Sequence, residues 1–133
     1  MHLELVTVVV EDYDEAIGFF VDLLGFHLAE DSLAVTSVGG RPKRWVVVRP
    51  PHAATGLLLA LADGDDQAAV VGTQVAGRVG FFLRVEDFQA VYTRLQAADV
   101  TFVRSPRVEP YGQVAVFLDI AGNRWDLLGP APQ

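Results

Sequence analysis

The sequence predicts an α+β fold in which two β-α-β-β-β modules form a half-closed curved sheet. The main observation is an internal similarity. Residues 6–13 and residues 81–88 both run from apolar residues through an acidic pair to an aromatic residue, and Asp12 corresponds to Asp87. Two long copies cannot build a solenoid, which needs about three or more short repeats. With 51% hydrophobic and 20% charged residues, the 133-residue chain is typical of a single globular domain. We therefore expect the functional site in a cleft between the modules.

The first module covers about residues 1–65 and begins with a strand and a helix. Residues 5–10 are mostly β-branched and apolar, which predicts a strand covered on both faces. Asp12 or Asp14 caps the helix that follows. Gly25 ends it, because glycine readily takes a positive φ. The apolar residues that recur at helical spacing are Ala16, Ile17, Phe19, Phe20, Leu23 and Leu24.

Three further strands complete the first module. They are predicted at residues 26–30, 44–49 and 57–62. A glycine-rich turn at residues 39–42 separates the first two, and Pro50 and Pro51 break the second. Residues 66–77 form the linker between the modules.

The second module, about residues 78–133, repeats the same order. Residues 79–85 predict a strand. Residues 88–98 predict a helix whose Val91, Leu95 and Ala98 share one stripe. The remaining strands are predicted at residues 100–104, 113–118 and 124–128, with a loop at residues 105–111.

The composition excludes several functions. A net charge of −7 disfavours nucleic acid and anionic membranes as partners, because both select basic surfaces. The absence of cysteine excludes disulfides, thiolate zinc sites and cysteine nucleophiles. No signal-peptide pattern is present, and no apolar run approaches the roughly 20 residues of a membrane span. We expect a cytoplasmic protein. Nucleophile-elbow and phosphate-loop motifs are also absent.

Two stretches resemble the vicinal-oxygen-chelate superfamily, which includes glyoxalase I, bleomycin-resistance proteins and extradiol dioxygenases. The first is residues 6–26, ending in Leu-Gly-Phe, and the second is residues 111–127, ending in Gly-Asn-Arg-Trp-Asp-Leu. Together with the segments between them, they extend the resemblance over nearly the whole chain. The resemblance implies the glyoxalase/bleomycin-resistance/dioxygenase fold, a half-closed barrel that a dimer partner often completes.

The resemblance also identifies four positions at which metal-dependent members carry ligands. In those members each module supplies a His near the start of its first strand and a Glu in its last strand, leaving positions open for substrate oxygens. The corresponding residues here are Leu5, Leu59 or Ala60, Gly80 and Asp126. Because one carboxylate cannot hold a divalent ion, we expect no metal and no other cofactor. The histidines, none with a second ligand at a suitable spacing, are His2, His27 and His52.

Starting from the positions that the resemblance identifies, strand alternation predicts the side chains that line the cleft. Tyr111 is added because it lies in a Pro-Tyr-Gly loop over the predicted mouth of the cleft. The predicted ligand-binding residues are Leu5, Thr7, Gly80, Phe82, Arg84, Tyr111, Arg124 and Asp126. Apolar walls with a few orienting polar groups are typical of a small-molecule site. Asp126 has two interpretations: an acceptor or base facing a ligand, or a carboxylate paired with Arg124 or Arg84 that joins strands. Trp125 faces the helices by the same alternation and is predicted to lie in the core.

Three functional hypotheses follow. The favoured one is a metal-free homodimer that binds a small, partly apolar molecule between its modules. The alternative is an enzyme of lyase, isomerase or dioxygenase type, with an unusual metal or a metal-free acid/base site at Asp126. A third is an accessory module whose cleft closes on a partner chain. The scaffold does not identify the ligand, because one fold hosts many chemistries.

Overall fold

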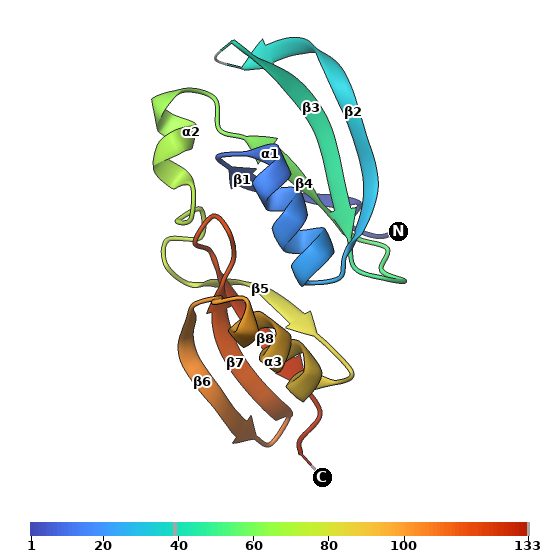
Figure 1. Ribbon diagram of the computed structural model, residues 1–133, viewed down its shortest axis with the longest axis vertical. Helices are drawn as coiled ribbons and strands as arrows, with labels where there is room; N and C mark the ends of the chain where they lie inside the picture. Colours follow the sequence, from blue (N-terminus) through green and yellow to red (C-terminus); the bar gives the residue numbers. More distant parts are fainter. Residues whose placement is uncertain (39, 133) are drawn as a thin grey trace.

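The computed structural model describes residues 1–38 and 40–132. It contains two four-stranded mixed sheets with the same internal order, β1-β4-β3-β2 and β5-β8-β7-β6 (Figure 1). In each sheet the first and last strands of the module are parallel neighbours, and the other pairings are antiparallel. The predicted fold class and the order of elements in both modules are confirmed.

The elements follow the chain in two similar series. The first module contains β1 (Leu5–Val10), α1 (Tyr13–Ile17), the π-helix η1 (Gly18–Leu23), β2 (His27–Val38), β3 (Arg41–Arg49) and β4 (Gly56–Leu61). The connection contains α2 (Gly64–Val70). The second module contains β5 (Val79–Arg84), α3 (Phe88–Ala97), β6 (Phe102–Glu109), β7 (Gly112–Leu118) and β8 (Arg124–Gly129). Of the predicted turn at residues 39–42, residue 39 lies outside the described residues.

Equivalent aspartates start the helix of each module. The side chain of Asp12 accepts a hydrogen bond from the backbone N–H of Glu15 at 2.8 Å, and that of Asp87 accepts one from Ala90 at 3.0 Å. These contacts satisfy backbone donors that have no partner in the first helical turn. Gly25 follows the first helix with a φ of 84°, as a terminating glycine should.

Three strand predictions differ from the structure. The strand predicted at residues 44–49 begins earlier, at Arg41, so Arg41 and Pro42 of the predicted turn belong to β3. The loop predicted at residues 105–111 is wrong for its first part, because β6 continues to Glu109. The register of β6 with β7 shifts between Arg104 and Arg107, where Pro106 interrupts the pairing. Proline is tolerated there because β6 is an edge strand and its missing N–H removes no pairing within the sheet. The first-module strand predicted at residues 26–30 is also longer, running to Val38.

One apolar core runs through both modules on the helix-covered side of the sheets. Figure 1 shows α1 against the first sheet and α3 against the second. Phe20 and Phe117 are fully buried, and each contributes about 2–3 kcal/mol by burial. Trp125 stacks on Phe81 with ring centroids 4.5 Å apart and contacts Phe20 from the other module at 5.7 Å. The prediction of Trp125 as a core residue is confirmed.

Hydrogen bonds between the modules fix how they sit against each other. Arg94 of α3 donates to the carbonyl of Leu23 at 2.7 Å. Gln74 in the connection accepts from the N–H of Val9 at 3.0 Å and donates to the carbonyl of Thr7 at 2.8 Å. Gln74 thereby satisfies backbone groups on the free edge of β1. Over the ranges 1–38 and 40–132, no helix has the length and apolar character needed to cross a membrane.

Candidate functional site

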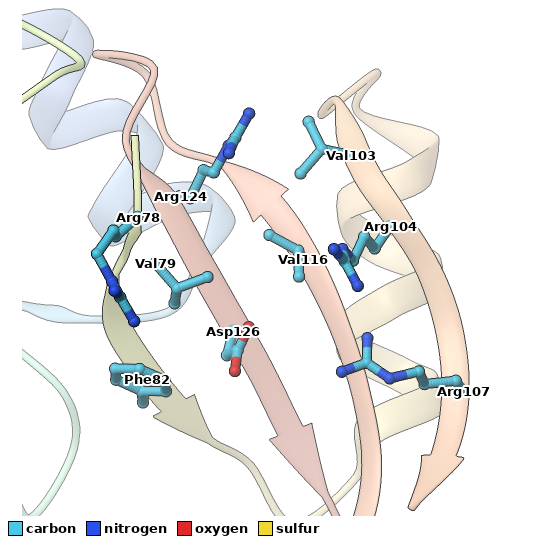
Figure 2. Close-up of a pocket in the computed structure, with 9 residues that line it drawn as sticks. All are labelled: Arg78, Val79, Phe82, Val103, Arg104, Arg107, Val116, Arg124 and Asp126. Carbon is cyan, nitrogen blue, oxygen red and sulfur yellow. The ribbon is translucent and has the colours of Figure 1, made fainter. Parts of the chain in front are cut away.

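The second sheet has a hollow on the face opposite α3, and the first module has a hollow lined by strand residues and by Tyr13 of α1 and Gln67 of α2. The second-module hollow has a volume of about 600 Å³. Its lining residues, drawn in Figure 2, are Arg78, Val79, Phe82, Val103, Arg104, Arg107, Val116, Arg124 and Asp126. The first-module hollow has a volume of about 470 Å³, and its walls include Thr7, Val9, Trp45, Leu58 and Ala60. The two hollows are separate in the single chain.

Alternation along β8 puts Asp126 in the second-module hollow. Trp125 and Leu127 point into the core, so Asp126 between them points to the opposite face. Its neighbours across the sheet are Phe82 on β5 and Val116 on β7. The floor of the hollow is thus a continuous row of side chains across adjacent strands, with one carboxylate at its centre.

A bulge in β5 determines which residues join this floor. The pairing of β5 with β8 shifts between Val79 and Phe81, so Gly80 has no partner there. Val79 consequently lines the hollow on the same side as Phe82, and Phe81 turns to the core against Trp125. The Cβ of any other residue at position 80 would lie 2.7 Å from a methyl group of Val75, so a substitution there would displace the Val75 side chain.

The pKa of the Asp126 carboxyl group is shifted by its surroundings. Removal from water raises the pKa of Asp126 above its ordinary value, and the positive charges of Arg107 and Arg104 oppose this rise. No ion pair within 4.0 Å joins Asp126 to any residue described by the structure. Arg124, one of its predicted partners, donates to the carbonyl of Gly77 at 2.7 Å. Asp126 is therefore left available to a group entering the hollow.

The first-module hollow is built differently. Its one arginine, Arg44, is held by Asp31 at 2.6 Å and by Asp14 at 2.9 Å, and it lies over the ring of Tyr13. These bonds raise the pKa of Arg44 and lower that of Asp31. Trp45 remains 44% exposed on this face. The hollow thus offers mainly apolar surface, with its arginine already neutralised.

Comparison with known proteins places this architecture in a family. The model of the Glyoxalase/Bleomycin resistance protein/Dioxygenase superfamily matches residues 2–127. The chain belongs to this superfamily. The predicted resemblance is confirmed, since the superfamily is the vicinal-oxygen-chelate group.

Relatives in the superfamily cover almost the whole chain. An uncharacterized protein of Shewanella frigidimarina is 48% identical over 124 residues, covering 92% of this chain and 89% of its own. The crystal structure of UcmS2 superposes with a TM-score of 0.76 and 32% identity, covering 96% of this chain and 97% of that one. TnmS3, described as an antibiotic binding protein from Streptomyces sp. CB03234, has a TM-score of 0.75 and 32% identity, with 98% and 97% covered.

The positions that carry metal ligands in some superfamily members do not suit a metal here. Leu5, Gly80 and either Leu59 or Ala60 have no side-chain donor atom, and Asp126 alone offers a carboxylate. Within residues 1–38 and 40–132, no three His, Asp or Glu side chains are grouped so that they could hold an ion. The residues present do not fit the superfamily's divalent ion, and no step through one is derived below.

The structure divides the predicted ligand-binding residues among several places. Phe82, Arg124 and Asp126 line the second-module hollow, whereas Thr7 lines the first-module hollow. The remaining predicted residues, which line neither hollow, are Leu5, Gly80, Arg84 and Tyr111.

Sequence reasoning missed most of the cationic wall of the second-module hollow. Arg104 and Arg107 come from the part of β6 around the register shift, and Arg78 precedes β5. Simple alternation fails on β6, because the unpaired residue between Arg104 and Arg107 changes which face the following side chains occupy. Arg78 was missed because it precedes the predicted strand. The grouping of these three arginines with Asp126 in one hollow follows from the pairing of the strands.

Proposed function

We propose that this superfamily member binds a small, partly apolar molecule in the second-module hollow without a metal ion. The observation that carries the proposal is the combination of Phe82, 65% exposed, with the half-buried carboxylate of Asp126 and a wall of valines. Its volume of about 600 Å³ lies in the usual range for small-molecule sites. The likeness to TnmS3, an antibiotic binding protein, supports the same reading.

A second copy of the chain completes the site in this proposal. A bound small molecule normally has about 70–90% of its surface buried, which an open sheet face cannot provide. Each module exposes an aromatic residue in its hollow, Trp45 in the first and Phe82 in the second. In a homodimer the first-module hollow of one protomer closes over the second-module hollow of its partner, by side-by-side contact or by exchange of modules. Two equivalent closed cavities result.

Binding without metal has a direct test. Purified protein, dialysed against chelator, is titrated with Zn²⁺, Ni²⁺, Mn²⁺ and Fe²⁺ in a calorimeter. We expect no tight stoichiometric site, because three of the four superfamily positions lack donor atoms. A single tight site per chain that disappears in Asp126→Asn would overturn the metal-free proposal.

The dimer is tested by sedimentation equilibrium. We expect twice the chain mass of 14.4 kDa and a weaker dimer for Trp45→Ser. A protein that stays monomeric at high concentration and still binds ligand tightly would contradict closure by a second copy.

A second candidate function is favoured by the raised pKa of Asp126. Carboxyl groups with raised pKa values serve as acids or bases in many active sites. An enzyme of this kind would move a proton on a small carbonyl compound through Asp126. Asp126→Asn that loses turnover but keeps ligand affinity supports the enzyme, and equal loss of both supports the binding protein.

A further inference from the structure

The second-module hollow is basic although the protein is acidic. Arg78, Arg104, Arg107 and Arg124 line it, which is four of the ten lysines and arginines in a chain of net charge −7. Two carboxylates accompany them, Asp126 on the floor and Glu109 bonded to Arg107 at 2.8 Å. The lining residues and their ion-pair partner therefore carry a surplus of positive charge, which raises the local concentration of anions.

The guanidinium groups approach the same space from two sides. Figure 2 shows Arg104 and Arg107 reaching from β6 toward Asp126, and Arg78 on the opposite side beside Phe82. Arg104 is joined to this floor by the pairing of β6 with β7, where it lies opposite Val116. Cations and an exposed aromatic ring thus share one hollow, so a single small molecule can contact both.

Structural arginines elsewhere in the chain behave differently. Arg44 is neutralised by two carboxylates, and Arg94 is bonded to the carbonyl of Leu23. By contrast, the guanidinium groups of Arg78 and Arg104 donate no hydrogen bond to any part of the chain that the structure describes. Two of the four guanidinium groups in the hollow therefore keep donors available, and an anionic ligand would offset the repulsion among these like charges.

We propose that the ligand is an organic oxyanion with a flat aromatic body. Its carboxylate or phosphate receives paired N–H donors from Arg104 and Arg107, with Arg78 at the other side, because the planar guanidinium matches both oxyanions. The aromatic body lies against Phe82 and the valines. Asp126 accepts a hydrogen bond from a hydroxyl or amine elsewhere on the ligand. This inference rests on the proposed binding function and names the chemical class of its ligand.

The test uses four probes of matched shape on the full-length protein. They are 2-naphthoate, 2-naphthyl phosphate, neutral 2-naphthamide and cationic 2-naphthylmethylammonium, titrated calorimetrically at low and at physiological salt. We expect at least one anion to bind about tenfold or more tighter than the amide, as a charge-assisted hydrogen bond provides. The comparison of naphthoate with naphthyl phosphate separates a carboxylate ligand from a phosphate ligand. Naphthamide binding as tightly as both anions overturns the inference and leaves the proposed function standing. Failure of all four probes contradicts both.

Variants separate the roles of individual arginines. Arg104→Gln with Arg107→Gln should abolish the preference for anions, lowering the affinity for the anions about tenfold more than the affinity for naphthamide. Arg41→Gln is the matched control, because Arg41 is exposed on the first module and bonds the carbonyl of Glu11. Circular dichroism and melting temperature establish that each variant is folded. If the double variant keeps the anion preference, the inference is wrong. It is also wrong if the double variant loses dimerisation while anion affinity stays intact, because the arginines would then bind the second copy.

Discussion

Phe82 and Asp126 are direct neighbours in the parallel pairing of β5 with β8, so an exposed aromatic ring lies beside a half-buried carboxylate. The same row continues through Val116 to Arg104 at the far edge of the sheet. One line across four strands therefore presents an aromatic face, an acid, an aliphatic side chain and a cation. A sheet can build such a row only when alternation and register agree on every strand.

Adjacent phenylalanines on β5 should separate binding from stability. Phe82→Ala removes a ring that is 65% exposed, so we expect weaker ligand binding and a free energy of unfolding changed by less than about 0.5 kcal/mol. Phe81→Ala removes the ring stacked on Trp125 and should cost about 2 kcal/mol or more. Urea denaturation measures stability, and calorimetry with the naphthyl probes measures binding. Equal destabilisation by both substitutions would show that Phe82 is a structural residue.

Because Asp126 is half-buried, we expect its ionisation to make the free energy of unfolding depend on pH. Its folded-state pKa is raised above the ordinary value of 3.8, mainly by burial, so the folded chain holds this proton more tightly than the unfolded chain does. Ionisation of Asp126 therefore lowers the free energy of unfolding. This loss of stability is absent below pH 3.8, grows as the pH rises through the folded-state pKa, and is complete above that pKa. Asp126→Asn should therefore be more stable than the natural chain at pH 7.

Urea denaturation of both proteins at pH 7 and at pH 3 measures this difference. The stabilisation should vanish at pH 3. Asp22→Asn is a suitable control, because Asp22 is exposed on η1. A variant less stable than the natural chain at pH 7 would mean that Asp126 holds strands together through its charge.

The elements that could be predicted from the sequence are those whose periodicity is uninterrupted. The run of valines in β1, the helical spacing around Phe20 and the alternation in β8 each identify an element and its buried face. The position of Trp125 in the core and of Asp126 on the open face follows from the last of these.

The residues that could not be predicted follow breaks in pairing. Val79 lines the hollow because the bulge at Gly80 restarts the alternation, and Arg107 lines it because β6 continues past Pro106. The only sequence signals at these two shifts are Gly80 and Pro106. Glycine and proline are equally typical of turns, so neither residue indicates a bulge by itself. Alternation also identifies the open face of each sheet, but it does not indicate whether the open faces of the two sheets line one common cleft. Thr7 and Asp126, predicted to share one cleft, accordingly lie in separate hollows of the chain.

Gln74 should matter for the junction of the modules. Its side chain bonds the N–H of Val9 and the carbonyl of Thr7, so Gln74→Ala leaves two backbone groups on the edge of β1 without these partners. We expect a loss of about 1 kcal/mol and faster amide hydrogen exchange at Val9. Gln96→Ala is the control, because Gln96 is exposed and its side chain donates to the hydroxyl of Tyr92 on the same helix, α3. Exchange at Val9 as slow as in the natural chain would contradict this role.

Asp119 should be the most sensitive carboxylate in the chain, although it lines no part of the second-module hollow. It is 6% exposed, and one oxygen accepts the N–H groups of residues 121, 122 and 123, each at 2.9 Å. The other oxygen accepts the indole N–H of Trp125 at 2.8 Å.

Removing this side chain leaves several donors inside the turn before β8 without an acceptor. Asp119→Ala should lower the free energy of unfolding by about 3 kcal/mol and shift the fluorescence of the core tryptophan. Asp119→Asn keeps an acceptor oxygen and should cost less. Because the same turn delivers Asp126 to the hollow, probe binding should weaken in Asp119→Ala even at temperatures where it is folded. Unchanged stability in urea denaturation would show that water replaces the carboxylate without loss.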